Sequence, residues 1–300
     1  MSEHFSIILN PKSNLSHKVI EYFNSSKIDY IRNDEKEKLI KILQKKIKAG
    51  CIDFIICGGD GTINNFINTY MQLPPKIRVS LKIGFLPCGK ANDLVRELNI
   101  PFDIKSAFKQ ILRKRIKEID LIKINNSYFL TGGGLGLPTE TVKDVELFSS
   151  KNVGKMLTKK LRNLIYLLFV IKKMFFGYGG IESTIIKNQY KNKKNLMLIS
   201  VQNQSFIGKR FMLAPNADNC DGFFEICIIE KPNNIISNLL MLHKIVRGKH
   251  LDSKGVFQYK TKKVLISTKK ANHFMADGEL LCYSNTFKIE IVPHAIKVYY

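Results

Sequence analysis

The sequence lacks most of the patterns that assign a chain to a class of protein by composition alone. None of its six cysteines forms a Cys-x-x-Cys pair, and its six histidines show no metal-ligand spacing. The cysteines therefore indicate free thiols in a reducing cytosol rather than a disulfide framework or a zinc site. We expect no signal peptide, since the first ten residues have neither a basic segment nor a long apolar one. The longest apolar run, Leu164–Ile171, is too short to span a bilayer.

Acidic residues are scarce relative to basic ones. The chain has 48 Lys plus Arg against 25 Asp plus Glu, which gives a formal net charge of +23. This excess favours an anionic partner, such as a nucleotide, a nucleic acid or an anionic membrane surface. A general lysine bias in the composition is the alternative explanation. No RNA-binding motif with stacked aromatics is evident, so we expect no nucleic-acid partner.

The order of predicted elements indicates two domains in the 300 residues. Residues 1–118 alternate short apolar runs with amphipathic helical patterns, which predicts an α/β domain. After residue 118 the runs are short and rich in β-branched and aromatic residues, which predicts an antiparallel β-rich domain over residues 119–300. We expect the last strand to return to the first domain.

The most informative stretch is a glycine-rich turn in the first domain. The apolar run Phe54–Cys57 predicts a buried strand, and it ends in Gly58 and Gly59, which are followed by Asp60 and a helical spacing. Glycines allow a ligand to approach the backbone, and the helix N-terminus attracts phosphate. Because a carboxylate repels phosphate, Asp60 indicates a metal-nucleotide site in which it holds Mg²⁺ directly or through water. The alternative is an ordinary turn in which Asp60 or Thr62 caps the helix.

Two further turns are predicted at the same sheet edge. Asn10–Asn14 follows the apolar run Phe5–Leu9, and Lys12 and Ser13 could contact phosphate there. A plain Asn-Pro turn is the alternative.

The second of these turns is Pro87–Arg96, which follows the strand Leu81–Leu86. Lys90 could neutralise phosphate. Asp93 could bind Mg²⁺, orient an acceptor hydroxyl or simply cap a helix.

The second domain contains several features that the strand pattern alone does not explain. We interpret Gly132–Gly136 as a loop that forms a bulge or a close packing site, and Asn192–Lys194 as a polar turn between strands. Residues 154–178 predict a helix that mixes apolar and cationic side chains. That helix could lie on an anionic membrane surface or pack over a domain interface.

Two acidic turns follow in the second domain. Asp218 and Asp221, with a backbone carbonyl beyond them, could ligate one hard cation. Asp277 and Glu279 flank a glycine just before the run Leu280–Tyr283, and a carboxylate there could take a proton from a substrate hydroxyl.

Taken in order, Gly58–Thr62, Pro87–Asp93, Pro215–Gly222 and Asp277–Glu279 resemble the motifs of the bacterial lipid kinases that contain the diacylglycerol kinase catalytic domain. The resemblance covers nearly the whole chain. The glycine motif alone is shared with NAD kinases and sphingosine kinases. The resemblance implies an N-terminal three-layer α/β nucleotide-binding domain and a C-terminal β-sandwich, with the active site in the cleft between them. It also implies transfer of a phosphoryl group from ATP to a lipid hydroxyl, with Mg²⁺ as cofactor.

The resemblance implies a role for each matching position. Asp277 or Glu279 would be the general base, and Asp60 and Asp93 would serve Mg²⁺ and phosphate geometry. Asp218, Asp221 and the Phe223 carbonyl would form a structural Mg²⁺ site. The residues implied at the nucleotide are Asn10, Pro11, Lys12, Ser13, Asn14, Gly58, Gly59, Asp60, Gly61, Thr62, Ile63, Asn64 and Lys90.

Three positions depart from the family pattern. The family usually has Glu at Asn65, Thr at Lys90 and Gly at Asn14. Lys90 adds a charge where a hydroxyl would contact nucleotide, so it is either a compensating phosphate ligand or a sign of weakened ATP binding. We favour an active enzyme because the core aspartates remain.

These observations predict a cytoplasmic protein that acts at the inner face of the membrane on diacylglycerol or a related lipid. A NAD kinase-like enzyme and a non-catalytic protein that binds anionic membranes are the competing hypotheses. Whether the protein forms a homodimer is left open by the sequence.

Overall fold

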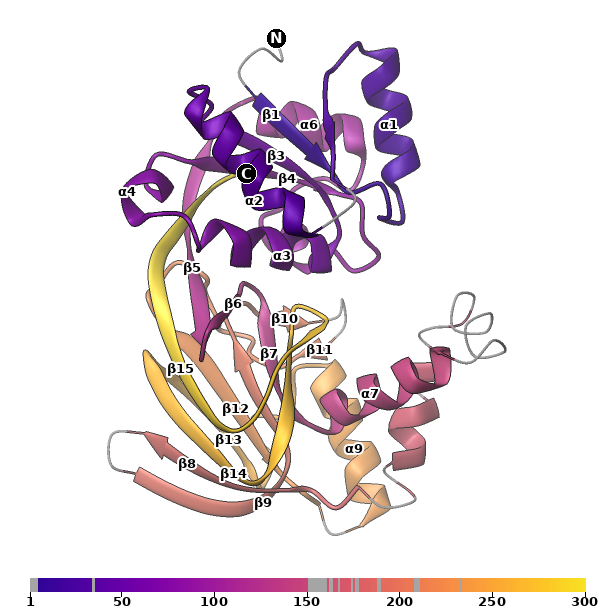
Figure 1. Ribbon diagram of the computed structural model, residues 1–300. Coiled ribbons are helices and arrows are strands. Elements are labelled where there is room, and N and C mark those ends of the chain that lie inside the picture. The colour runs from indigo at the N-terminus through magenta and orange to yellow at the C-terminus, as the bar shows by residue number, and fades with distance from the viewer. Residues whose placement is uncertain are drawn as a thin grey trace.

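The computed structural model describes residues 5–33, 36–150, 161, 164–166, 168–173, 175, 178–187, 190–207, 211–232 and 234–300. Figure 1 shows two layered domains, one above the other, with the last strand running between them.

The N-terminal domain is a parallel sheet with helices on both faces. Its strands are β1 (Phe5–Leu9), β2 (Ile31–Arg32), β3 (Asp53–Gly58) and β4 (Lys82–Pro87), in the order β2-β1-β3-β4. Its helices are α1 (Ser16–Ser25), α2 (Lys36–Lys48), α3 (Asp60–Tyr70), α4 (Pro75–Arg78), α5 (Asp93–Glu97) and α6 (Ile104–Ile111). Every residue of β3 is buried, as expected for a strand covered on both faces.

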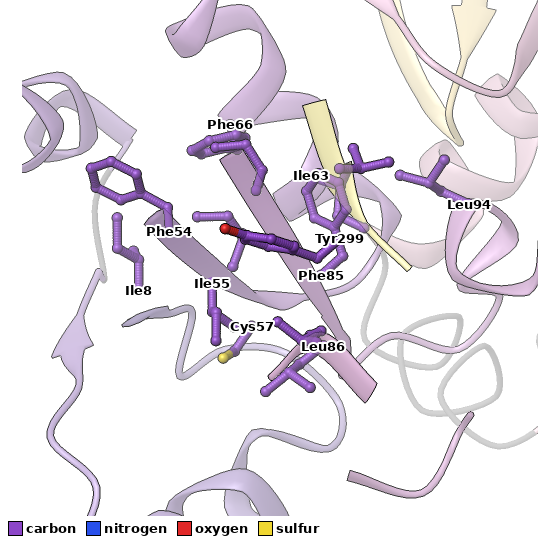
Figure 2. Close-up of a cluster of buried hydrophobic side chains, with 14 of the residues drawn as sticks. Ile8, Phe54, Ile55, Cys57, Ile63, Phe66, Phe85, Leu86, Leu94 and Tyr299 are labelled. Carbon is purple, nitrogen blue, oxygen red and sulfur yellow. The ribbon is translucent and has the colours of Figure 1, made fainter. Parts of the chain in front are cut away.

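The core of this domain fixes the start of α3 relative to the sheet. Phe66 of α3 and Phe85 of β4 are 1% and 0% exposed, and Figure 2 shows them with Ile63 and Tyr299 in one cluster. Burying one such side chain contributes about 1.5–3 kcal/mol to stability. The helix therefore has little freedom to move away from the strand that precedes it.

The C-terminal domain is antiparallel. Its strands are β5 (Ile116–Ile124), β6 (Ser127–Phe129), β7 (Gly132–Gly136), β8 (Ile181–Lys187), β9 (Tyr190–Gln202), β10 (Phe206–Ile207), β11 (Phe211–Met212), β12 (Phe224–Glu230), β13 (Val256–Thr261), β14 (Lys263–Ala276) and β15 (Glu279–Tyr299). Among the residues that the structure describes in full, it contains the helices α7 (Leu137–Ser149) and α9 (Ile235–Val246). One apolar cluster lies among the curved strands, and a second lies between the strands and the helices.

Strand β15 joins the two domains. It pairs antiparallel with β14 and β5, and near its end Lys297 and Val298 pair parallel with Lys82 and Ile83 of β4. The hydroxyl of Tyr299 then donates to Asp53 Oδ1 at 2.7 Å inside the first domain. The predicted fold class, an α/β domain followed by a β-sandwich, is confirmed. The division at residue 118 stays a prediction, because β5 runs through it.

Three local expectations were wrong or incomplete. Gly132–Gly136 is strand β7 rather than a loop, although its packing is close, since a Cβ on Gly133 would lie 2.6 Å from the Ala276 Cβ. Asn192–Lys194 lies inside β9, opposite Ser183–Ile185 of β8, rather than in a turn. Helix α7 was not predicted. The helix predicted over 154–178 lies partly outside the described residues.

Candidate active site

The turns after β1, β3 and β4 lie side by side at the carboxyl edge of the N-terminal sheet. The Asn10 side-chain amide donates to Thr62 Oγ1 at 2.8 Å, and Ser13 Oγ lies 3.5 Å from the same oxygen. The backbone N–H of Leu15 donates to the Cys88 carbonyl at 3.0 Å. The three predicted nucleotide turns therefore form one connected surface.

Two glycines allow the second and third turns to touch. A Cβ built on Gly59 would lie 2.7 Å from the Gly89 Cα, and one on Gly89 would lie 2.5 Å from the Gly59 Cα. No other residue fits either position without moving backbone. The two turns therefore touch through their backbones.

Asp60 bridges these two turns through both of its carboxylate oxygens. Oδ2 accepts the Asn92 backbone N–H at 3.0 Å, and Oδ1 accepts the Asp93 N–H at 2.9 Å. Asn92 precedes α5 with a left-handed φ of 53° and gives that helix no side-chain cap, because its own Oδ1 accepts from Gly89 N. Asp60 therefore caps α5 from another turn. Each oxygen keeps a further lone pair for a cation.

Asp60 and Asp277 line one small cavity between the domains. A water-sized molecule can occupy only about 10 Å³ of it. The residues that line it are Asp60, Ile63, Leu94, Leu130, Thr131 and Asp277. The side chain of Asp93, 8% exposed, belongs to the neighbouring first turn of α5.

Asp277 is fully engaged by hydrogen bonds. Its carboxylate accepts from Asn64 Nδ2 at 2.8 Å, Leu130 N at 3.0 Å, Thr131 N at 2.9 Å and Thr131 Oγ1 at 2.6 Å. Burial raises the pKa of Asp277, and these four hydrogen bonds oppose the rise. A carboxylate has about four acceptor sites, so none is left for a substrate hydroxyl.

Glu279 lies on the other side of the same hairpin turn and is exposed. Asp277 and Gly278 occupy the turn with φ of 49° and 81°, the pattern of an Asp-Gly type I′ turn. A Cβ on Gly61 would lie 2.5 Å from Glu279 Oε1, so the Glu279 carboxylate rests on the first turn of α3.

The other predicted nucleotide residues divide into two groups. Lys12, Asn14 and Lys90 are exposed at the edge of the turns. Ile63 and Asn64 are 2% and 6% exposed, and their side chains point into the protein. Only their backbone groups could face a nucleotide, because the Asn64 amide binds Asp277 instead.

Helix α3 is also attached to the second domain, which the sequence did not predict. Asn68 Nδ2 donates to the Tyr128 carbonyl at 2.9 Å, and the Tyr128 N–H donates back to Asn68 Oδ1 at 2.8 Å. Asn64 adds a longer bond of 3.3 Å to the same carbonyl. One helix therefore contacts both the nucleotide turn and the hairpins of the second domain.

The predicted structural metal turn has oxygen donors of the kind that Mg²⁺ prefers. Asp218 Oδ1 accepts the Cys220 N–H at 3.1 Å, and Asp221 Oδ1 accepts the Phe223 N–H at 2.9 Å. The other oxygen of Asp221 forms an ion pair with Lys260. Within the described ranges no three Asp, Glu, His or Cys side chains form a metal-binding group. Mg²⁺ fits this turn only if it displaces the Lys260 ammonium from Asp221.

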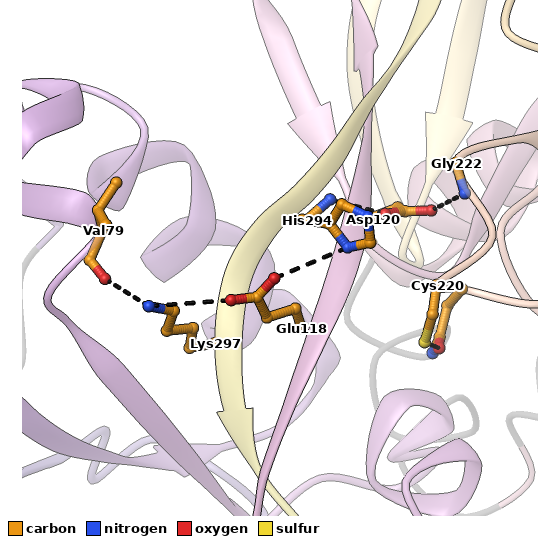
Figure 3. Close-up of polar contacts among 8 residues, drawn as sticks. Val79, Glu118, Asp120, Cys220, Gly222, His294 and Lys297 are labelled. Atoms are coloured by element: carbon orange, nitrogen blue, oxygen red, sulfur yellow. Dashed lines mark hydrogen bonds and ion pairs between the residues drawn. The ribbon is translucent and has the colours of Figure 1, made fainter.

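Asp120 positions this turn and was missed by the sequence analysis. Its side chain is 0% exposed, and its carboxylate accepts the Gly222 N–H at 2.7 Å and the His294 N–H at 2.8 Å (Figure 3). Burial raises the pKa of Asp120, and both hydrogen bonds oppose this. An acidic residue between Ile119 and Leu121 in an apolar strand was the signal that could have identified it.

Models of two protein families match the chain. The diacylglycerol kinase catalytic domain matches residues 4–124, and the YegS C-terminal NAD kinase beta sandwich-like domain matches residues 150–300. A candidate lipid kinase, SAS0691 of Staphylococcus aureus strain MSSA476, is 28% identical over 266 residues, which is 87% of this chain and 81% of that protein.

Solved structures share the fold over nearly the whole chain. The crystal structure of a candidate diacylglycerol kinase from Bacillus anthracis str. Sterne has a TM-score of 0.77 and 21% identity. A structure of a diacylglycerol kinase from the same organism has a TM-score of 0.72 and 20% identity. Each comparison covers 99% of this chain and 97% of the other.

The two matched domains together cover most of the chain, and they define a two-domain protein of the diacylglycerol kinase type. This chain belongs to the diacylglycerol-kinase-like family of lipid kinases. In the part of the chain that the structure describes, no helix has both the length and the apolarity needed to cross a bilayer.

Proposed function

We propose that this protein transfers the γ-phosphoryl group of ATP to the hydroxyl of diacylglycerol or a related lipid, to give a phospholipid such as phosphatidic acid. The observation that carries the proposal is the position of Glu279, an exposed carboxylate resting on the first turn of α3 beside Gly61. A phosphate bound at that helix N-terminus would lie next to a base that can reach an incoming hydroxyl.

The nucleotide would lie along the three connected turns. The backbone N–H groups at the start of α3 would donate to its phosphates, and Lys12 and Lys90 would neutralise their charge. The extra charge of Lys90 is consistent with a phosphate ligand, because its turn touches the glycine turn at Gly89. Asn10 and Ser13 would support this surface through Thr62.

Asp60 and Asp93 would hold the catalytic Mg²⁺, since both lie at the junction of the two turns and offer hard oxygen ligands. When bound, Mg²⁺ would neutralise charge that develops on the transferred phosphoryl group. Asp60 has a second task in capping α5, so its side chain is held in a fixed orientation.

Glu279 would accept the proton of the lipid hydroxyl as the oxygen attacks phosphorus. Asp277 would act as a positioning residue, because its four hydrogen bonds tie the hairpin turn to α3 and to Leu130–Thr131. The structure thus favours Glu279 over Asp277 as the base. A structural Mg²⁺ at Asp218, Asp221 and the Phe223 carbonyl is part of the proposal.

Labelled ATP, Mg²⁺ and a panel of hydroxyl lipids in detergent micelles test the proposal. We expect label in at least one lipid of the panel. In the cell, we expect the same reaction at the inner face of the cytoplasmic membrane. If ATP binds but no lipid in the panel is labelled, the proposal is wrong. Label in NAD instead would identify a NAD kinase-like enzyme.

A further inference from the structure

Four apolar side chains form a stripe on the outside of the second domain. They lie at described helical positions, where Leu161, Leu164, Leu168 and Phe175 are 48%, 50%, 54% and 47% exposed. At 3.6 residues per turn they fall within an arc of about 60° on one side of the helix. We call these four residues the apolar stripe.

Helix α9 presents a similar outer face. Ile236, Leu239 and Leu240 in its first half are 72%, 38% and 56% exposed. Lys244 and Arg247, at the other end of the helix, are also exposed. Apolar side chains in one half and cations in the other give this face the composition of a membrane-surface helix.

The two helices cover the same side of the domain. Val170 from the first helix and Met241 and Ile245 from α9 lie in one buried cluster, so their outer faces point away from the same strands. Figure 1 shows these helices together on one side of the C-terminal strands. An ion pair of 3.0 Å between Lys173 and Asp144 of α7 helps to hold the first helix. The exposed leucines therefore belong to a packed layer.

The cations near these two helix faces indicate what binds there. Lys172 is exposed and lies within about 20° of Leu161 around the helix, beside the apolar stripe. The whole chain has a net charge of +23. An anionic bilayer satisfies both features at once, since its headgroups attract the cations and its acyl boundary accepts the apolar side chains.

We propose that the apolar stripe and the outer face of α9 form the surface on which this protein lies on an anionic bilayer. The inference rests on the proposed function, which places the substrate in a membrane. It specifies which face of the second domain meets that membrane, with the leucines at the headgroup–acyl boundary and Lys172, Lys244 and Arg247 among the headgroups.

The chain contains no tryptophan, so one introduced tryptophan reports its own surroundings. We would compare Leu164→Trp with Val79→Trp, a control on the first domain where Val79 is 66% exposed. On vesicles of phosphatidylcholine with about one third phosphatidylglycerol, Leu164→Trp emission should shift to the blue and Val79→Trp emission should not. Unchanged Leu164→Trp emission on vesicles that bind the protein overturns the proposal.

A second variant tests the contribution to binding. Leu164→Gln combined with Leu168→Gln should weaken partition into the same vesicles by about tenfold or more, while Val79→Gln should bind like the unmodified chain. The melting temperature and the affinity for ATP show whether the double variant is folded. If the folded double variant binds the vesicles as well as the unmodified chain does, the proposal is overturned. The proposal is also overturned if high salt abolishes binding and the two leucine substitutions do not change it, because charge alone then explains the binding.

Both vesicle experiments are done without ATP, so they are independent of catalysis. If no lipid is phosphorylated but the vesicle results hold, the proposed function fails and the docking surface stands. If lipid is phosphorylated in detergent micelles but the vesicle results fail, the function stands and this surface is not the membrane contact. If this apolar face binds a protein partner instead of a membrane, lipid would be phosphorylated in micelles and the vesicle results would fail.

Discussion

Replacing the two acids of the hairpin turn separates positioning from proton transfer. Asp277→Asn keeps the size and the left-handed backbone of this residue, since Asn tolerates a φ of 49°. Its single carbonyl oxygen can accept only about two of the four bonds that Asp277 accepts. The new amide nitrogen would then lie against the Asn64 amide and the Leu130 N–H. All three groups are donors, so Asn64 and Leu130 would lose their acceptor.

The size of this effect follows from the burial of the site. Asp277 is 6% exposed, and each buried donor left without an acceptor costs about 1–3 kcal/mol. With two donors unpaired, we expect Asp277→Asn to lower the free energy of unfolding by about 2–6 kcal/mol. Glu279→Gln should leave that free energy nearly unchanged, because the Glu279 side chain is exposed.

Activity should show the reverse order, with Glu279→Gln having the larger effect and Asp277→Asn the smaller. Glu279→Gln removes the proposed base and should lower kcat by about 10²–10⁴-fold with little change in ATP affinity. Urea unfolding of both variants and initial rates in lipid micelles make the comparison. An Asp277→Asn variant of normal stability would show that the four hydrogen bonds do not hold the turn. A fully active Glu279→Gln variant would move the role of base elsewhere.

Three further predictions test other parts of the structure. Gly61→Ala should lower kcat by roughly 10–100-fold at an unchanged melting temperature, because the new Cβ would push the Glu279 carboxylate aside. A normal kcat would contradict the contact between Gly61 and Glu279. Burial lowers the pKa of His250, and the hydrogen bond from its ring to the Leu213 backbone opposes this, so the unfolded chain binds more protons. Stability measured in urea should therefore fall as pH drops below about 6.5, and His250→Gln should remove that part of the slope. Lys260→Met should make the melting temperature rise more steeply with Mg²⁺ concentration than in the unmodified chain, because the ion pair to Asp221 is gone. An equal dependence on Mg²⁺ would argue against a metal at Asp218 and Asp221.

Local patterns predicted the parts of the fold that depend on neighbouring residues. Strand β3 and the glycine turn follow from an apolar run that ends in Gly58 and Gly59. The same reasoning failed at Asn192–Lys194, because a polar run has the same composition in a hairpin arm as in a turn, and only the pairing with β8 shows which it is. Helix α7 was missed because the exposed Leu147 and the buried Val145 do not give one apolar face in the sequence.

The site depended on contacts between residues far apart in the chain. From the sequence alone, Asp277 and Glu279 were equal candidates for the base, since both are acids beside a glycine. Their difference appears only when the hairpin turn places one against Asn64, 213 positions away, and the other against Gly61. The cap that Asp60 provides to α5 likewise joins two turns that no local pattern connects.

Helix α3 explains why the glycine turn and the acidic hairpin belong to one site. Its first turn touches Glu279 at Gly61, its second turn binds Asp277 through Asn64, and its third turn binds Tyr128 through Asn68. Because residues 61, 64 and 68 are spaced by three and four, they share one face of the helix. That face meets the second domain, while the N-terminus of the same helix meets the nucleotide turns. Any rotation of α3 would therefore move the phosphate-binding backbone and the contact with the base together.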